Sequence, residues 1–204
     1  RYLFKSSLCN RNKMNTKSQL QQFINIGLHL GGAALPNATK GWGTYDLDIV
    51  ARRYNRSFYD TNKIWYNINN MLTFLKNSPE ARTVFGSFTK DYYQMLNEAS
   101  LRCHATFYGD GENWIYGQYT TFLKRQDFEI AYLPDIIHNH ALFREFKPSF
   151  AVIIGIKTTD SIENIDYPLI GDPANAYHVL YYTHLISYII ARSKIKVEEI
   201  EIKD

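Results

Sequence analysis

Several features are scarce in this chain of 204 residues, and each scarcity excludes a class of protein. Two cysteines, Cys9 and Cys103, are too few for the disulfide framework of a small secreted domain, so a reducing, cytoplasmic environment is expected. The longest apolar runs, around 150–156 and 185–191, are far shorter than the roughly 20 residues that span a bilayer, so no membrane partner is expected. A net charge of +3 is too small to indicate nucleic-acid binding by itself.

The chain also lacks internal repeats and low-complexity tracts, and its length fits one domain, residues 1–204. Its N-terminal segment is locally basic, and residues 1–14 are interpreted as a flexible or docking arm. No signal-peptide pattern is visible. Because the first residue is Arg1 rather than Met, a processed chain, a piece of a polyprotein or a trimmed form is expected.

Hydrophobic residues make up 45% of the chain, which is enough to build a sizeable core. Apolar residues at helical spacing predict helices at about 15–26, 61–76 and 91–101, and a long helix at 174–192. Ser78-Pro79-Glu80 predicts one more helix start, because serine caps a helix and proline fits its first turn.

Alternating or continuous apolar segments predict strands at 45–51, 128–133, 150–157 and 194–202. Residues 103–108 and 114–123 flank a Gly-Asp-Gly turn signal and are predicted to form a β-hairpin. This order of elements predicts an α+β domain with a mixed, mostly antiparallel sheet and helices packed on it.

The strongest functional signal is the stretch Leu30–Val50, LGGAALPNATKGWGTYDLDIV. Asp46 and Asp48 stand two residues apart on a predicted strand, so both carboxylates point to the same face. Such a pair can share divalent cations, and Mg²⁺ prefers oxygen ligands together with substrate phosphates. The alternative is a pair of solvated acids that holds no metal.

A double glycine, Gly31-Gly32, follows a short apolar run in the same stretch. Glycine allows the backbone to approach a phosphate closely, and the first N–H groups of a helix favour anions. An anion site beside a cation site would suit a nucleoside triphosphate and its metal.

Together these residues resemble the nucleotidyltransferase superfamily typified by DNA polymerase β, most closely its minimal toxin and abortive-infection members. Leu30-Gly31-Gly32, a spacer, and Asp46-Leu47-Asp48-Ile49 match the core pattern of that family. The resemblance implies transfer of a nucleotide from a nucleoside triphosphate to an RNA, protein or small-molecule acceptor, with Mg²⁺ or Mn²⁺ as cofactor.

The resemblance also implies roles for individual residues. Asp46, Asp48 and a third carboxylate, Glu129 or Asp127, would hold the metal and support catalysis. Gly31 and Gly32 would approach the triphosphate, and Arg52, just after the acidic strand, would offset phosphate charge.

A second function class stays open, namely a non-catalytic structural or interaction protein in a viral or multi-protein assembly. Tyrosines interleave with Arg52, Arg53 and Arg56, and this composition suits either RNA stacking or a protein–protein interface. Two weaker constellations are a metal pair, His138 and His140, and a peptidase nucleophile, Cys9. The peptidase reading lacks a histidine at the start of the 150–156 strand, where its base would stand.

Overall fold

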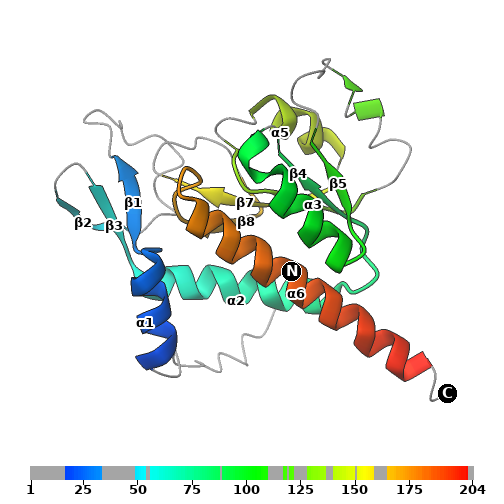
Figure 1. The fold of residues 1–204 in the computed structure, drawn as a ribbon, viewed down its shortest axis with the longest axis horizontal. Helices are drawn as coiled ribbons and strands as arrows, with labels where there is room; N and C mark the ends of the chain where they lie inside the picture. The colour runs from blue at the N-terminus through cyan, green and yellow to red at the C-terminus, as the bar shows by residue number, and fades with distance from the viewer. Residues whose placement is uncertain are drawn as a thin grey trace, which may run out of the picture.

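The computed structural model describes residues 17–33, 49–53, 56–87, 89–109, 117–118, 120–121, 128–136, 140–149, 151–158 and 165–201. Its largest element is a five-stranded sheet of β4 (Thr83–Gly86), β5 (Thr106–Tyr108), β6 (Ile130–Leu133), β7 (Val152–Lys157) and β8 (Tyr167–Ile170). All four neighbouring pairs in this sheet are parallel. The sheet lies between helices in Figure 1.

The strand order of this sheet is β5-β4-β6-β7-β8, so the chain starts near the middle, goes to one edge and then returns past its start. This is a doubly wound order, in which the topological switch point lies between β4 and β6. The carboxyl ends of β4 and β6 therefore mark the place where open α/β sheets take their ligands.

Helices cover both faces of the parallel sheet. One face packs against α2 (Thr61–Asn77), α3 (Tyr93–Arg102) and α6 (Ala176–Glu201), through sheet residues that include Phe85, Tyr132 and Ile154. The other face packs against α5 (His140–Phe146) through Val84 and Ile153. Short 3-10 turns, η1 (Lys90–Tyr92) and η2 (Lys147–Ser149), precede α3 and follow α5.

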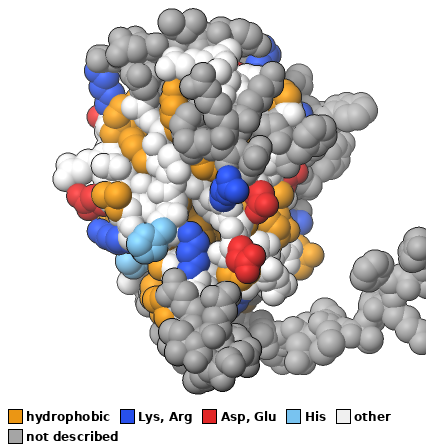
Figure 2. Space-filling view, turned by 90° about the vertical axis from the view of Figure 1, so that its right-hand side faces the viewer, with side chains coloured by type: hydrophobic (Ala, Val, Ile, Leu, Met, Phe, Trp, Pro, Cys, Tyr) orange, Lys and Arg blue, Asp and Glu red, His pale blue; other side chains and the backbone are white. Residues whose placement is uncertain are grey.

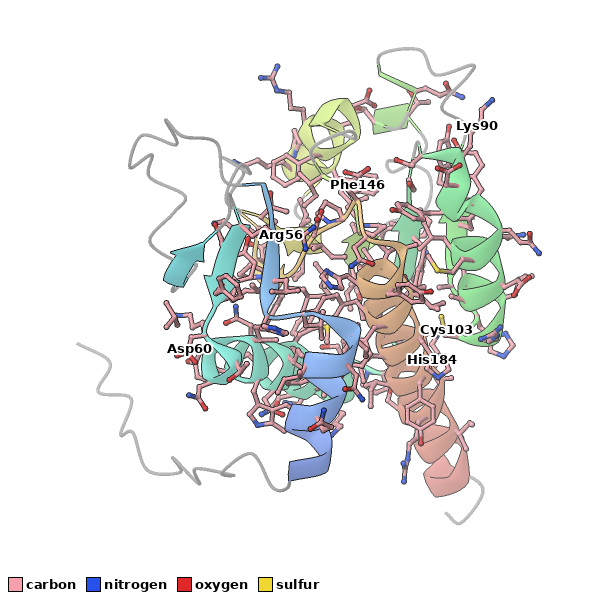
Figure 3. All side chains as sticks on the ribbon, turned by 60° about the vertical axis from the view of Figure 1, so that its left-hand side comes forward. Arg56, Asp60, Lys90, Cys103, Phe146 and His184 are labelled. Carbon is pink, nitrogen blue, oxygen red and sulfur yellow. The ribbon has the colours of Figure 1, made fainter. Side chains whose placement is uncertain are left out.

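The remaining strands form a small antiparallel sheet in the order β1-β3-β2, made of β1 (Leu30–Ala33), β3 (Arg56–Tyr59) and β2 (Ile49–Arg53). It follows α1 (Lys17–Ile26) and leads into α2. The carboxylate of Asp60 accepts a hydrogen bond from the Asn62 amide at 2.9 Å and so caps α2. Figure 3 labels Arg56, at the start of β3, and Asp60, which directly precedes α2.

The prediction of an α+β domain with a mostly antiparallel sheet is wrong. The main sheet is entirely parallel, and the only antiparallel sheet in the described part of the chain is the three-stranded one. The fold is thus a mixed α/β arrangement. The sequence analysis missed two strands of the parallel sheet, β4 and β8, each of which is four residues long.

Two local predictions are also wrong, and a third is tested only in part. Residues 106–108 pair in parallel with β4, because α3 reverses the chain between the two strands, whereas most of the predicted partner strand of the hairpin, 114–123, lies outside the described residues. Ser78 ends α2, and the chain after Pro79 becomes β4 rather than a helix. The predicted strand at 194–202 is the continuation of α6 to Glu201, since no helix breaker stands between them.

Other elements are confirmed. The structure contains the predicted helices as α1, α2, α3 and the main part of α6, and the predicted strands as β6 and β7. In α2, the buried residues Ile64, Ile68, Met71 and Leu75 follow the periodicity on which the prediction rested. No described helix has both the length and the apolar character needed to cross a membrane.

Candidate functional site

The predicted catalytic residues are only partly described. Asp46, Asp48 and Asp127 lie outside the described residues, as do Cys9, His138 and the arm at 1–14. Glu129 directly precedes β6 in the parallel sheet and is exposed. Gly31, Gly32 and Arg52 lie in the small antiparallel sheet, where the Arg52 backbone pairs with Ser57. The proposed third carboxylate and the proposed phosphate loop thus belong to different sheets.

Gly31 has a packing role. It lies within β1 rather than at the start of a helix, and it is buried. A Cβ atom at Gly31 would come within 2.6 Å of the Tyr59 hydroxyl oxygen and 2.7 Å of Cζ in the same ring. Tyr59 itself is 3% exposed, so its ring has little room to move. The close approach of the Tyr59 ring is sufficient to explain why this position is glycine.

Glu129 lies at the amino edge of the parallel sheet. Its amide donates to the carbonyl of Arg82 at 3.0 Å, and its carbonyl accepts from the amide of Val152 at 2.8 Å. These bonds begin the ladders that join β6 to β4 and to β7. The carboxyl edge, where parallel sheets usually bind ligands, is at the opposite end of β6.

At the carboxyl edge, the described polar side chains beside the switch point are buried and bonded within the chain. Ser87, just after β4, is fully buried, and Asp135, just after β6, is 2% exposed. The Thr89 hydroxyl donates to the Asp135 carboxylate at 2.9 Å, and the Thr89 amide donates to the Ser87 hydroxyl at 3.1 Å. Ser87 and Thr89, which belong to a sequence that superficially suggests a phosphate loop, are therefore bonded to each other and to Asp135.

Other described residues at the same edge are also buried. Lys157 and Thr158, at the end of β7, are 2% and 5% exposed. The buried Tyr92 hydroxyl donates to the carbonyl of Pro173 at 2.6 Å, and this bond connects the start of α3 to the loop after β8. Burial, together with the nearby Asp135, Asp91 and Asp172 carboxylates, raises the pKa of Tyr92, so its hydroxyl stays protonated.

His178 closes the edge beside β8 and is 1% exposed. Its Nδ1 accepts a hydrogen bond from the Asp172 amide at 2.9 Å. Burial lowers the pKa of His178, and the charge of Asp172 and backbone groups of Ile26 and Gly27 oppose this shift only in part. The neutral ring thus joins the end of α1, the loop after β8 and the first turn of α6.

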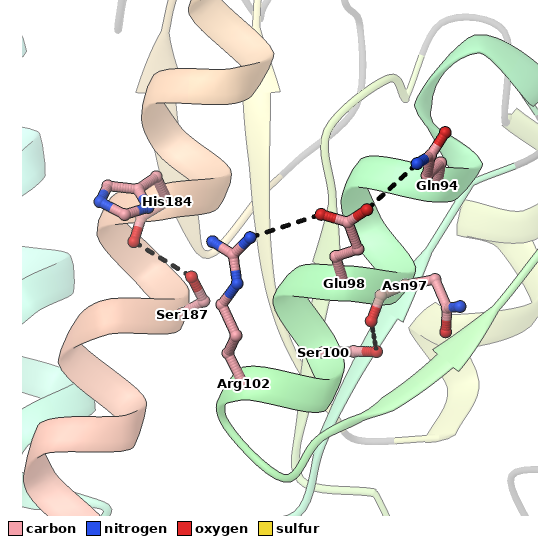
Figure 4. A network of polar contacts seen from close by, with 7 residues as sticks. All are labelled: Gln94, Asn97, Glu98, Ser100, Arg102, His184 and Ser187. Carbon is pink, nitrogen blue, oxygen red and sulfur yellow. Dashed lines mark hydrogen bonds and ion pairs between the residues drawn. The ribbon is translucent and has the colours of Figure 1, made fainter.

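An open groove runs between α3 and α6. It encloses about 330 Å³, and Met95, Ala99 and Leu180 contribute apolar lining. Its charged or titratable lining consists of Asp91, Glu98, Arg102 and His184. Figure 4 shows the Arg102 guanidinium directed to Glu98 on α3, with His184 on the neighbouring helix α6. The Glu98 carboxylate contacts the Arg102 guanidinium at 3.4 Å and accepts a hydrogen bond from the side-chain amide of Gln94 at 3.1 Å.

A second hollow of about 330 Å³ lies at the amino edge of the parallel sheet. Charged or titratable side chains from separate segments line it, including Glu80, Arg82, His104 and Lys194. The Lys194 ammonium donates to the carbonyls of Cys103 and His104 at 2.9 and 3.2 Å, so it satisfies the end of α3. Lys194 therefore serves the packing of α6 on α3.

Within the described ranges, no three histidine, cysteine, aspartate or glutamate side chains are placed to hold a metal ion together. The Mg²⁺ or Mn²⁺ site at Asp46 and Asp48 stays a prediction, because neither residue is described. Sequence analysis also missed the buried polar group at Asp135. Its one available signal was Pro134-Asp135 directly after a strand, which gains meaning only once that strand is known to be parallel.

Comparison with protein-family models finds no family that matches the chain. A search of curated proteins likewise finds no significant match.

Proposed function

We propose that this chain is a non-catalytic structural component of a multi-protein assembly. The observation that carries this proposal lies at the carboxyl edge of the parallel sheet, where the described polar side chains are buried and bonded within the chain. At the switch point, the buried side chains of Ser87 and Asp135 are occupied by Thr89. An enzyme of this architecture would keep that crevice open for its substrate.

The distribution of exposed hydrophobic side chains supports the same proposal. Single exposed apolar residues are normal on protein surfaces, but a concentration of them indicates an interaction site. Among the described residues, most of the large exposed ones lie on two adjacent helices: Leu101 on α3, and Tyr177, Leu180, Tyr188 and Ile195 on α6. Tyrosine and arginine are also the residue types that protein interfaces favour.

The nucleotidyltransferase reading, with a nucleoside triphosphate and an RNA or protein acceptor, stays a prediction. The position of Gly31 inside β1, against the Tyr59 ring and not in a phosphate loop, counts against it. Calorimetry with the four ribonucleoside triphosphates, in Mg²⁺ or Mn²⁺, separates the two readings. We expect no binding by the wild type; metal-dependent binding that Asp48→Asn abolishes would overturn the proposal.

A second experiment tests the proposal directly. The epitope-tagged full chain, expressed in its source cells, is sedimented through a density gradient. We expect it to migrate with a particle much larger than 23.8 kDa. Nuclease treatment before sedimentation then distinguishes a particle that RNA holds together from one that proteins hold together. Migration as a free 23.8 kDa chain would contradict a structural role.

A further inference from the structure

The ring of His178 is enclosed between two segments that are distant in the sequence. On one side, a Cβ atom at Gly27 would lie 3.8 Å from Nε2, and on the other side a Cβ atom at Gly171 would lie 3.4 Å from Nδ1. Because glycine has no side chain, the backbone at the end of α1 and the backbone after β8 both come close to the ring. The side chain is 1% exposed, so its two nitrogens face protein groups and not solvent.

The contacts of the ring determine which nitrogen carries its proton. The Asp172 amide, 2.9 Å from Nδ1, can only donate, so Nδ1 is the acceptor and the proton of the neutral ring is on Nε2. Nε2 faces backbone groups of Ile26 and Gly27 at the end of α1. The side-chain nitrogen of Asn175, 3.3 Å from Nε2, does not bond to it in this tautomer, because both atoms are donors. The folded structure therefore accommodates one proton on this ring and not two.

A second proton on His178 would conflict with the backbone of the loop after β8. Added at Nδ1, it would point at the Asp172 amide hydrogen, and two donors cannot bond to each other. The same residue offers a different acceptor, its carboxylate. At present this carboxylate accepts from the Ala174 amide at 3.0 Å, and water can replace that bond because Ala174 is exposed. Asp172 is only partly buried, so its side chain has room to turn towards the ring.

The other groups around the ring do not titrate near neutral pH. In the described part of the chain, Asp172 is the only charged side chain that acts on the pKa of His178, and α1 contributes backbone groups. The hydroxyls of Tyr92 and Tyr182 donate to backbone carbonyls of the loop and of β8. Burial raises the pKa of both tyrosines, so both stay neutral. A change of charge in this region near neutral pH therefore falls on His178.

We propose that His178 and Asp172 form a proton-operated switch that changes the conformation of the loop 171–175. With the ring neutral, Nδ1 accepts from the Asp172 amide, and the loop is closed on α1 and α6. With the ring protonated, Nδ1 donates to the Asp172 carboxylate, and the backbone of the loop turns away from the ring. Because the loop follows β8 at the carboxyl edge of the parallel sheet, one part of that edge becomes sensitive to acid. The switch belongs to the folded chain alone and does not depend on the proposed structural role.

Hydrogen exchange of the full chain, followed for each amide by NMR between pH 7.5 and 5, measures the opening of the loop. The protection factor, which is corrected for the intrinsic effect of pH on exchange, reports the fraction of open molecules. For the Asp172 amide it should be constant above pH 6.5 and fall by up to about tenfold per pH unit below it, since the open loop binds one more proton. The amide of Ile154, in the core strand β7, should keep its protection.

Nitrogen spectra of the histidine rings test the premise directly. The chain contains six histidines, and Figure 2 shows histidine side chains at the surface, so the signal that is lost in His178→Gln assigns the buried ring. We expect its proton on Nε2 at pH 7.5. A neutral ring with its proton on Nδ1 would contradict the hydrogen bond from the Asp172 amide, and with it the switch.

Four variants separate the roles of the partners. His178→Gln keeps a side-chain acceptor for the Asp172 amide but does not titrate, so the protection factor should no longer depend on pH. Asp172→Asn keeps the backbone amide but binds a protonated ring less well, so the fall should begin at a lower pH. Tyr92→Phe removes the bond to the carbonyl of Pro173, so protection should be lower at every pH, with the same dependence on pH. His184→Gln changes an exposed histidine of the same helix and should behave as the wild type.

Three results would overturn the inference: a protection factor of the wild-type Asp172 amide that does not change with pH, a fall that His178→Gln leaves in place, or a parallel fall at Ile154. The last would show that acid unfolds the whole chain rather than the loop. If His178→Gln does not fold, Asp172→Asn still decides the question, because a fall at the same pH as in the wild type would contradict the switch.

Discussion

The hydroxyl of Tyr132, on β6, lies 3.1 Å from the hydroxyl of Thr183, on α6, and both side chains are buried. The two residues are 51 positions apart, so this contact joins the centre of the parallel sheet to the long helix. Burial strongly raises the pKa of Tyr132, so its hydroxyl stays neutral and able to donate. The contact therefore helps to hold α6 on the parallel sheet.

Substitution Tyr132→Phe should destabilise the protein by about 1–3 kcal/mol, because the buried Thr183 hydroxyl loses its partner. The same reasoning applies to Thr183→Val. The double variant should be much less unstable than the sum of the two, since it leaves no unpaired hydroxyl at this position. Urea unfolding of the four proteins measures this coupling; strictly additive effects would show that the contact contributes nothing.

A second prediction concerns acid stability and His178. The pKa of the buried ring is below the usual 6.5, and protonation at Nδ1 would also break its hydrogen bond from the Asp172 amide. Between the folded and unfolded pKa values, the unfolded chain binds a proton that the folded chain does not. The contribution of His178 to stability is therefore complete above pH 6.5 and declines as the pH falls from 6.5 to the folded pKa.

The decline amounts to about 1.4 kcal/mol for each pH unit between the two pKa values. Chemical denaturation from pH 7.5 down to pH 5 measures it. His178→Gln should be less stable at pH 7.5, but it should lose the pH-dependent part that His178 contributes. If the wild type and His178→Gln show parallel pH profiles, His178 is not responsible for the decline.

The helices were predictable because their signal is local. In α2, four buried apolar residues recur at helical spacing and Asp60 caps the first turn, so the segment alone contains the evidence. The inner strand β7 was predictable for the same reason, since its residues 152–156 form a continuous apolar run. Such runs are typical of strands that are buried on both faces.

The parallel sheet was not predictable, because β4 and β8 are short and their strand character comes from their neighbours. Val84 and Phe85 form too brief an apolar pair to compete with the helix-start signal at Ser78-Pro79. Similarly, the turn signal at Gly109–Gly111 favoured a hairpin, whereas β5 pairs with β4, the strand that precedes α3 in the chain. The packing of α3 on the sheet brings β5 beside β4, and the sequence of residues 103–123 contains no sign of that packing.

The hydrogen bond between Thr89 and Asp135 at the switch point could not be predicted from the sequence for a similar reason. Thr89 and Asp135 are 46 residues apart, and they meet only because β4 and β6 are parallel neighbours. Conversely, the pattern at Gly31-Gly32 was visible, but the ring that fills the space beside Gly31 belongs to Tyr59, a residue that the pattern does not include. The Gly-Gly motif therefore drew attention to Gly31, but it contained no information about the Tyr59 ring that packs against it.

A third prediction tests that interpretation of Gly31. Gly31→Ala would place a methyl group 2.6 Å from the Tyr59 hydroxyl oxygen, which forces a buried ring to move. We expect a loss of about 1–3 kcal/mol in the free energy of unfolding, the range typical of overpacking. In a Tyr59→Phe background the loss should be smaller but not zero, because Cζ would still lie within 2.7 Å. A Gly31→Ala chain with unchanged unfolding would instead favour a role for Gly31 outside the core.

The last prediction concerns the thiol of Cys103, which is fully buried at the end of α3, on the side that faces α6 (Figure 3). Burial raises its pKa, and the charge of Lys194 opposes this shift only in part, so the thiolate that reacts with disulfide reagents is scarce. In a Cys9→Ser chain, in which Cys103 is the sole cysteine, we expect very slow modification by an aromatic disulfide until denaturant opens the structure. The rate should then follow the free energy of opening, since reagent and thiol meet only in the opened state.

Lys194→Met removes the two hydrogen bonds from α6 to the end of α3 and should accelerate modification at low denaturant, despite the loss of a charge that favours the thiolate. Slower modification in Lys194→Met would mean that the charge of Lys194, and not its link to the end of α3, controls the reactivity of Cys103.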